Sequence, residues 1–280
     1  MKNKQRPPLT YYGGKQQLVN KILPLIPDHL LYTEVFFGGG AVFFAKESVQ
    51  SVINDKNNNL INFYRQLKEN GKALIQRIQA SLYSEEEHRL AKKIYFDKIS
   101  AEETHFSPST KMKLEKAWAV FMLSHLSFLR ILGNCWHTCF SKRFDRNVIS
   151  NNPKRFSQKT INLVLNEYGK RLENTSIFNN DALKVLKKAD KEHSFHYIDP
   201  PYINTNCGHY SGYTEDDFEN LLKTCSELKG KFMLSSFPSD ILEFYTLEYG
   251  WKTIKIEKAK SASQPNSNNR KKIEVITMNY

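Results

Sequence analysis

Short apolar runs alternate with helical apolar patterns at both ends of this chain, whereas its middle carries helical patterns alone. Runs typical of buried strands cover residues 32–37, 51–55, 177–178, 195–199, 231–235, 251–256 and 272–278. Helices are expected at residues 14–26, from about residue 41, at 59–67, from 181 and at 215–228. Strands that alternate with helices predict an α/β fold with a largely parallel sheet.

A change of pattern divides the chain into a core and an insertion. From about residue 71 to 127, helical patterns and dense charge replace the alternation, and residues 134–157 are polar and irregular. The apolar stretch 117–132 is interrupted by polar residues, which favours a buried helix over a membrane span. The alternation returns after residue 161. We therefore predict an α/β core from residues 1–70 and 161–280, with a mostly helical, basic insertion at residues 71–160.

Charge and cysteine content change this picture in two ways. The 280 residues carry a formal net charge of +12 and the pI is near 9.3, an excess that favours a polyanionic partner such as nucleic acid. No apolar segment follows the basic residues 1–8, so no secretory signal is expected. The four cysteines are therefore expected as free thiols in a reducing cytoplasm.

Five sulfur and imidazole side chains form a candidate zinc set: Cys135, His137 and Cys139 alternate along one segment, and Cys207 and His209 follow later. Alternate residues of an extended segment face the same way. Their spacing is not that of a zinc finger or ribbon, and partly buried thiols are the alternative. We predict no metal site.

The tetrapeptide Asp199-Pro200-Pro201-Tyr202 directly follows the apolar run 195–198. Because two prolines force a strand to stop, a carboxylate, a carbonyl outside any ladder and an aromatic ring meet at the strand's carboxyl end. Ligands bind at that edge of open α/β sheets. The set suits a flat heterocycle with an exocyclic amine, since Asp199 and the Pro200 carbonyl each accept one N–H while Tyr202 stacks on the ring. A tight turn with an exposed acid is the alternative.

A second constellation is a glycine-rich turn between an expected strand and helix, with Glu34, Phe36, Phe37, Gly38 and Gly40 as its members. Glycines there let a ligand approach the backbone beside the positive end of a helix. Asp55 ends the next apolar run, about twenty residues downstream, where an acid commonly accepts the ribose hydroxyls of a cofactor. An N-cap of the following helix would also explain Asp55.

Two further segments are candidates for binding. Tyr11-Tyr12-Gly13-Gly14-Lys15 opens the first expected helix, where backbone amides and the Lys15 ammonium would hold a carboxylate. An ordinary turn with a solvated lysine is the alternative. The segment 204–210, with His209 and Tyr210, either closes over a bound base or is a surface loop.

Taken together, these motifs resemble the Dam-like family of DNA N6-adenine methyltransferases in their order and spacing. Residues 12–15 look like the family's amino-terminal cofactor motif, residues 34–44 like its glycine motif, and residues 199–202 like its catalytic tetrapeptide. Asp55 matches the ribose-binding acid, Asp181 sits where the family has an acid near the cofactor's adenine, and residues 270–280 look like its terminal hairpin. The resemblance implies a Rossmann-like S-adenosylmethionine-dependent methyltransferase core with residues 71–160 as the target-recognition domain.

The resemblance also implies roles for individual residues. Asp199, Pro200 and Tyr202 would be catalytic, acting on an adenine flipped out of double-stranded DNA. S-adenosylmethionine would be held by Tyr11, Tyr12, Gly13, Gly14, Lys15, Glu34, Phe36, Phe37, Gly38, Gly40, Asp55, Asp181 and Asp199. The DNA-binding residues would be Lys142, Arg143, Arg146, Arg155, His209, Tyr210 and Arg270. We expect a cytoplasmic enzyme of a bacterium or phage, either solitary or paired with a separate restriction endonuclease.

The middle of the chain departs from the family pattern. Members that read GATC carry an Asn-Gly-containing hairpin with a following Arg and Asn, whereas residues 128–136 here read Phe-Leu-Arg-Ile-Leu-Gly-Asn-Cys-Trp. This looks closer to a phage- or mobile-element-associated branch, so no recognition sequence is transferred. Cytosine-N4 methylation, an RNA substrate and a non-catalytic cofactor-binding DNA-binding protein stay open. A nicotinamide-dependent oxidoreductase would leave the tetrapeptide and the basic insertion unexplained.

Overall fold

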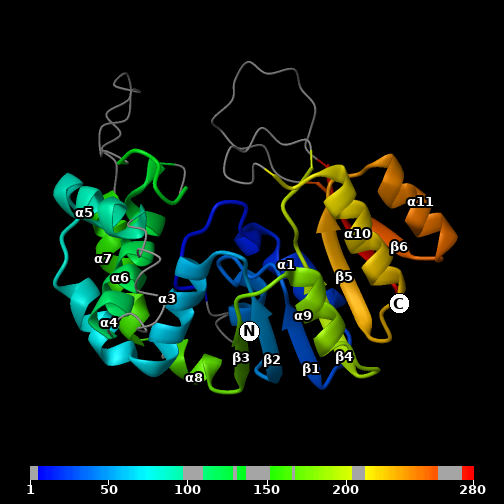
Figure 1. Cartoon of the computed structure of the whole chain (residues 1–280), viewed down its shortest axis with the longest axis horizontal. Helices are drawn as coiled ribbons and strands as arrows, with labels where there is room; N and C mark the ends of the chain where they lie inside the picture. Colours follow the sequence, from blue (N-terminus) through cyan, green and yellow to red (C-terminus); the bar gives the residue numbers. More distant parts are fainter. Residues whose placement is uncertain are drawn as a thin grey trace, which may run out of the picture. The chain divides into compact units, whose positions relative to one another are not determined.

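The computed structural model of the chain (Figure 1) describes residues 6–96, 110–128, 131–136, 152–165, 168–203, 212–257 and 273–280. Its strands are β1 (Leu31–Glu34), β2 (Gln50–Asn54), β3 (Thr175–Phe178), β4 (Ser194–Ile198), β5 (Lys231–Ser236), β6 (Lys252–Glu257) and β7 (Ile273–Met278). They form a seven-stranded sheet in the order β3-β2-β1-β4-β5-β7-β6. The predicted α/β, Rossmann-like fold class is confirmed.

The helices follow the expected alternation with two differences. They are α1 (Val19–Ile22), α2 (Ala41–Ala45), α3 (Asn58–Glu69), α4 (Gly71–Gln79), α5 (Glu85–Phe96), α6 (Thr110–Leu126), α7 (Asn152–Leu165), α8 (Tyr168–Leu172), α9 (Ala182–Ala189), α10 (Glu215–Ser226) and α11 (Asp240–Glu248). The helix expected over residues 14–26 is broken into α1 and two 3-10 turns, η1 (Lys15–Gln17) and η2 (Leu23–Leu25). Pro24 has no N–H to donate, which prevents a continuous α-helix there. The sequence analysis missed α11.

The chain forms two compact units that each combine distant segments. The helical unit contains Met1–Pro24, Gly38–Ser48 and Asn57–Asn179, and the sheet unit contains Leu25–Phe37, Val49–Lys56 and Asn180–Tyr280. The predicted division into residues 1–70 with 161–280 and residues 71–160 stays a prediction. Among the described helices, none is long and apolar enough to cross a bilayer.

In the sheet unit, β4 is the central strand. It pairs in parallel with β1 on one side and with β5 on the other, and every one of its residues is buried. Burial on both faces is typical of a central parallel strand. β7 then pairs antiparallel with β5 and with β6. Figure 1 shows α9 and α10 in front of this part of the sheet, with α11 beside β6.

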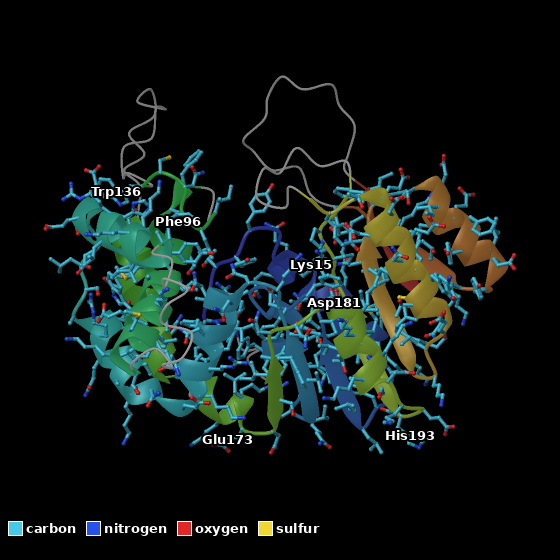
Figure 2. All side chains as sticks on the ribbon, in the orientation of Figure 1. Lys15, Phe96, Trp136, Glu173, Asp181 and His193 are labelled. Carbon is cyan, nitrogen blue, oxygen red and sulfur yellow. The ribbon has the colours of Figure 1, made fainter. Side chains whose placement is uncertain are left out.

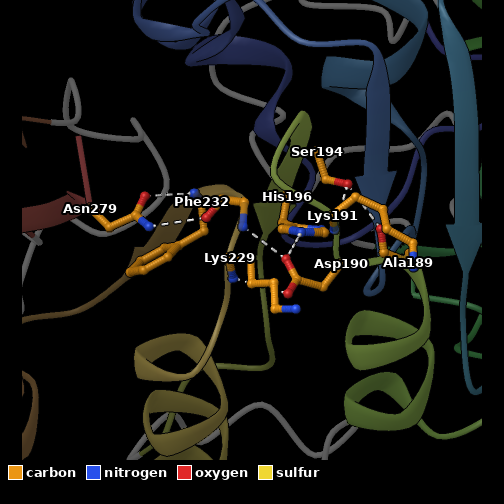
Figure 3. Close-up of polar contacts among 9 residues, drawn as sticks. Ala189, Asp190, Lys191, Ser194, His196, Lys229, Phe232 and Asn279 are labelled. Atoms are coloured by element: carbon orange, nitrogen blue, oxygen red, sulfur yellow. Dashed lines mark hydrogen bonds and ion pairs between the residues drawn. The ribbon is translucent and has the colours of Figure 1, made fainter.

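A polar network locks the amino-terminal ends of β4 and β5 together (Figure 3). The Asp190 carboxylate accepts hydrogen bonds from the backbone N–H groups of Lys229 and Gly230, both at 2.9 Å, and lies 3.2 Å from Nε2 of the buried His196. A Cβ on Gly230 would lie 2.8 Å from two carbonyl oxygens, so only glycine fits there. Asn279, which follows β7, bonds to the start of β5: its side chain accepts from the Phe232 N–H and donates to the Gly230 carbonyl.

The helical unit is organised around α6. Its residues 117–126 are all buried, as expected for a core helix, and α3, α4 and α5 pack against it. Arg77 of α4 lies with its guanidinium 3.9 Å from the Trp118 ring centroid and pairs with Glu115 at 3.0 Å. Trp118 in turn donates its Nε1 hydrogen to the Ser81 hydroxyl at 2.7 Å. Packing and satisfied polar groups thus fix this helix in place.

Candidate active site

The carboxyl ends of β1 and β4 lie side by side in the sheet unit. Glu34, the last residue of β1, is paired in register with Tyr197, and Asp199 follows the end of β4 directly. β1 pairs with β2 on its other side, so the strand order changes direction between β1 and β4. Such a switch point opens a crevice at the carboxyl edge, where α/β proteins bind ligands. Glu34 is buried, whereas Asp199 is half-buried, which does not match a turn with an exposed acid.

Asn54 joins three segments at this edge. Its Nδ2 donates to the Val35 carbonyl at 3.0 Å and to the Asn180 carbonyl at 3.1 Å, and its Oδ1 accepts from the Asn180 N–H at 2.9 Å. Its own carbonyl accepts from the Phe37 N–H at 2.9 Å. The side chain is fully buried and all its donor and acceptor groups are used. Asn54 therefore fixes the positions of the segment that follows β1 and of the segment that precedes α9 relative to the end of β2.

Asp55 and Asp181 each directly follow a residue of the Asn54–Asn180 hydrogen-bond network. Asp55 is half-buried and follows Asn54, while the helix after it begins under a different cap: Asn57 accepts from the Leu60 N–H at 3.2 Å. The alternative that Asp55 is the N-cap of α3 is therefore wrong. Asp181, labelled in Figure 2, is exposed and caps α9 by accepting from the Lys184 N–H at 2.9 Å. Both carboxylates belong to the carboxyl edge of the sheet unit, whereas His193 marks the opposite end of α9 and β4.

The Tyr202 side chain turns its hydroxyl inward. It donates to Oε1 of Glu274 at 2.7 Å and lies 2.8 Å from the Ser235 hydroxyl, which itself donates to the same Glu274 oxygen at 2.7 Å. Its ring meets Phe237 edge-on, with the centroids 4.5 Å apart. Burial, together with the charges of Asp199 and Glu274, raises the pKa of Tyr202 far above its ordinary value. Tyr202 is therefore a neutral, firmly held ring.

Carboxylates gather around the end of β4. Burial first, and then the charges of Asp199, Glu34 and Glu274, raise the pKa of the buried Tyr197 well above its usual range. The Glu34 carboxylate also accepts a hydrogen bond from the Tyr32 hydroxyl. A region in which three acidic groups act on one side chain favours a cationic ligand or a hydrogen-bond donor.

The glycine-rich turn continues into the helical unit, where Tyr11 fills the space beside it. Gly38 has a φ of +50°, and a Cβ there would lie 3.2 Å from Cδ1 of Tyr11. A Cβ on Gly39 would lie 3.1 Å from the Tyr11 Cβ. Gly40, with a φ of +67°, caps α2, and the Tyr64 hydroxyl donates to the Gly38 carbonyl at 2.9 Å. Close packing against Tyr11 is thus a reason for glycine at these positions, independent of any ligand.

Lys15 is enclosed within the helical unit. Only 5% of it is exposed, so the alternative of a solvated lysine is wrong. Gly14 closes the preceding turn by donating to the Tyr11 carbonyl at 3.2 Å, and the Lys15 Nζ donates to the Gly13 carbonyl at 3.4 Å. Lys15, labelled in Figure 2, is the first residue of η1. A buried ammonium next to a turn of backbone amides can bind an anionic group.

The sequence profile of the D12 class N6 adenine-specific DNA methyltransferases matches residues 11–263 of this chain. The chain belongs to this family. It is therefore an N6-adenine DNA methyltransferase, which uses a methyl donor and acts on DNA, and the resemblance stated from its motifs is confirmed.

Individual relatives agree with the family. The Type II methyltransferase M1.LlaDCHI of Lactococcus lactis subsp. cremoris is 31% identical over 98% of this chain and 95% of its own length. The modification methylase StsI of Streptococcus sanguinis is 25% identical over 73% of this chain and 30% of its own length. The DNA adenine methylase of Vibrio cholerae serotype O1 is 34% identical over 34% of this chain and 33% of its own length.

The methyltransferase distributes its predicted site residues over both units. The sheet unit contains Glu34, Phe36, Phe37, Asp55, Asp181, Asp199, Pro200 and Tyr202. The helical unit contains Tyr11, Tyr12, Gly13, Gly14, Lys15, Gly38 and Gly40. The predicted DNA contacts Lys142, Arg143, Arg146, His209, Tyr210 and Arg270 lie outside the described residues, and Arg155 lies in α7.

Three residues of this site were missed by the sequence analysis: Asn54, Ser235 and Glu274. The signal for Glu274 is a single acid between Ile273 and Val275 in an apolar strand, because such an acid needs a hydrogen-bonding partner if it is buried. Asn54 and Ser235 carry no comparable signal, since Asn and Ser are common at strand ends.

Two of the four cysteines, Cys135 and Cys225, lie within the part of the chain that the structure describes. Cys225 is a buried free thiol whose pKa burial raises, and Cys135 is exposed. Within the described ranges there is no group of three or more His, Cys, Asp or Glu side chains suited to a metal ion. His137, Cys139, Cys207 and His209 of the candidate zinc set lie outside those ranges.

Proposed function

We propose that this methyltransferase transfers a methyl group from S-adenosylmethionine to N6 of an adenine flipped out of double-stranded DNA. The observation that carries the proposal is the half-buried Asp199 at the switch point between β1 and β4, followed by two prolines and the inward-tied Tyr202. Taking a base out of the duplex costs a few kcal/mol. Stacking on an aromatic ring offsets roughly 1–3 kcal/mol of that cost.

Asp199 and Pro200 would act on the exocyclic amine. Each accepts one of the two N6 protons, Asp199 through its carboxylate and Pro200 through its carbonyl, which draws N6 toward tetrahedral geometry and localises its lone pair. The amine must lose one proton on methylation, and within the tetrapeptide only the carboxylate of Asp199 can take it up. The half-buried position of Asp199 strengthens both interactions by lowering the local dielectric.

The residues of the sheet unit fit the proposed donor. When bound, S-adenosylmethionine supplies an activated methyl group on a sulfonium cation. The half-buried Asp199 carboxylate, which follows the end of β4, favours a cation at this edge. Asp55 would accept from the ribose hydroxyls and Asp181 from the adenine amine.

The net charge of +12 supports binding to the DNA backbone. We assign the phosphate contacts to the basic residues Lys142, Arg143, Arg146, Arg155 and Arg270, and stacking contacts to His209 and Tyr210. Since its substrate is DNA, we place the enzyme in the cytoplasm of a bacterium or phage-infected cell. The names of the relatives from Lactococcus and Streptococcus are those of restriction-modification enzymes. This favours pairing with a separate endonuclease over a solitary role.

The decisive test is methyl transfer from labelled S-adenosylmethionine to genomic DNA that lacks adenine methylation, followed by sequencing of modified bases. We expect N6-methyladenine within one short motif. Label in RNA alone, or in cytosine, would contradict the proposal. The same experiment identifies the recognition sequence.

The assignment of phosphate contacts has its own test. Neutralising Arg143, Arg146 and Arg155 together is expected to weaken DNA binding and to flatten the dependence of log K on log salt, by about 0.9 for each phosphate that is no longer neutralised. Binding measured by anisotropy at salt concentrations between about 50 and 200 mM gives this slope. An unchanged slope would place the DNA elsewhere on the protein.

A further inference from the structure

Three oxygen atoms from separate segments meet beneath the catalytic tetrapeptide. The Tyr202 hydroxyl, the Ser235 hydroxyl of β5 and Oε1 of Glu274 in β7 form a triangle with sides of 2.7, 2.7 and 2.8 Å. Ser235 and Glu274 are each 0% exposed. Their register is set by the β5–β7 pairing, which places Ser235 opposite Ile276 and Ser236 opposite Val275.

This triangle determines where the Tyr202 ring lies. The Cβ, Cγ and Cζ atoms and the hydroxyl oxygen of a tyrosine lie on one line, so an anchored hydroxyl fixes the direction of the ring axis, and packing against the ring limits its rotation about that axis. Phe237, which follows β5, closes one edge of the ring at 4.5 Å. The hydroxyl is occupied inside the protein, so Tyr202 meets a ligand with its ring alone.

We propose that Glu274 and Ser235 are positioning residues, which hold the Tyr202 ring in place for stacking on the target base. The proposal rests on the proposed function, because it assigns a purpose to the ring at that site. The two residues are needed for the rate of methyl transfer, although neither reaches the substrate. Holding the ring before the base arrives removes an ordering cost from the transition state.

A purely structural role for the triangle predicts something different. The same two strands would lose stability without Glu274, and activity would fall only as far as the protein unfolds. β7 offers a matched control in Thr277, which is also 0% exposed and lies 3.0 Å, hydroxyl to hydroxyl, from Thr253 of β6. Thr277→Val removes a buried hydroxyl from the same strand without touching the triangle.

The test measures single-turnover methyl transfer to DNA, cofactor affinity and thermal stability for the full chain and its variants. We expect Glu274→Leu and Tyr202→Phe each to slow transfer about tenfold while the Kd for S-adenosylmethionine changes less than about twofold. Glu274→Gln retains an acceptor oxygen and is expected to keep transfer within about threefold of the wild-type rate. Thr277→Val is expected to lower the thermal stability and to leave the rate of methyl transfer unchanged.

A double-mutant cycle separates positioning from independent effects. Combining Tyr202→Phe with Glu274→Leu should slow transfer no further than the more severe single change, because both break the same contact. Losses that multiply would overturn the proposal, and so would an unchanged rate in either single variant. If Glu274→Leu does not fold, Ser235→Ala decides, with a slower transfer at unchanged cofactor affinity expected and an unchanged rate refuting it. A wild-type chain that methylates no DNA would instead refute the proposed function, and the inference with it.

Discussion

Replacing Asn54 by aspartate changes one nitrogen to oxygen at the centre of the carboxyl edge. The amide donates to the carbonyl of Val35 at 3.0 Å and to that of Asn180 at 3.1 Å, and a carboxylate can donate to neither. The bond from the Asn180 N–H to Oδ1 would survive, because both side chains accept there. The variant therefore loses two hydrogen bonds and gains a buried charge that faces two carbonyl oxygens.

The cost follows from the burial of each partner. The bond to Val35 is buried, so its carbonyl would lack a donor at about 1–3 kcal/mol, whereas the bond to Asn180 is only partly buried and water can replace some of it. With the cost of burying a carboxyl group, we expect the free energy of unfolding to fall by about 2–4 kcal/mol. Typical proteins have about 5–15 kcal/mol in total, so the variant should still fold.

Urea unfolding of Asn54→Asp, followed by circular dichroism, measures this loss. Protonation would give the new carboxyl one donor back. Its pKa is therefore raised in the folded state, and the deficit should shrink as the pH is lowered toward about 4. Asn58→Asp is the matched control, since Asn58 is exposed at the first position of α3, where an acid is mildly favourable. Equal stability of the two variants, or a deficit that grows on acidification, would refute the role of Asn54.

The remaining predictions concern catalysis, acid stability and the glycine turn. Asp199→Ala should abolish methylation while calorimetry finds cofactor affinity within roughly tenfold of the wild type, and retained turnover would exclude its catalytic role. Burial lowers the pKa of His196 despite the opposing effect of Asp190, so the unfolded chain binds the proton more readily than the folded chain. The free energy of unfolding should therefore fall as the pH drops below about 6.5. His196→Gln should reduce the slope of that fall. Gly38→Ala should lower the free energy of unfolding by about 1–2 kcal/mol, because the φ of Gly38 is +50° and an added Cβ would press on Tyr11. Gly71→Ala is the control: Gly71 begins α4 and has open space around an added Cβ, so this variant should be neutral or stabilising. Thermal unfolding measures both variants.

The sequence was sufficient for those parts of the fold where local signals agree. The run 195–198 followed by two prolines predicted β4 and its end, and the observed strand is Ser194–Ile198. The glycines at 38–40 predicted the turn before α2, and the positive φ of Gly38 and Gly40 adds a conformational reason that the sequence analysis did not give. Both features depend on neighbours along the chain, which a sequence displays directly.

Features that depend on distant partners were not predictable in the same way. The Glu274–Tyr202 bond joins residues 72 positions apart and exists only because β7 lies next to β5. Helix α11 was missed because its apolar residues do not keep to one face: Leu242 is buried, whereas Phe244 and Leu247 are largely exposed. The roles of the individual site residues stay predictions, which the experiments above address.

The position of β7 has a consequence for how the enzyme is made in the cell. This strand follows β6 along the chain, yet it lies between β5 and β6 and pairs with both. During synthesis, β5 and β6 must therefore wait with open edges until residues 273–278 emerge, and such edges are prone to pair with other chains. Because Glu274 arrives with the same strand, Tyr202 gains its anchor only when the sheet closes. A nascent chain can thus acquire the parallel strands of its fold well before it acquires the power to modify the DNA around it.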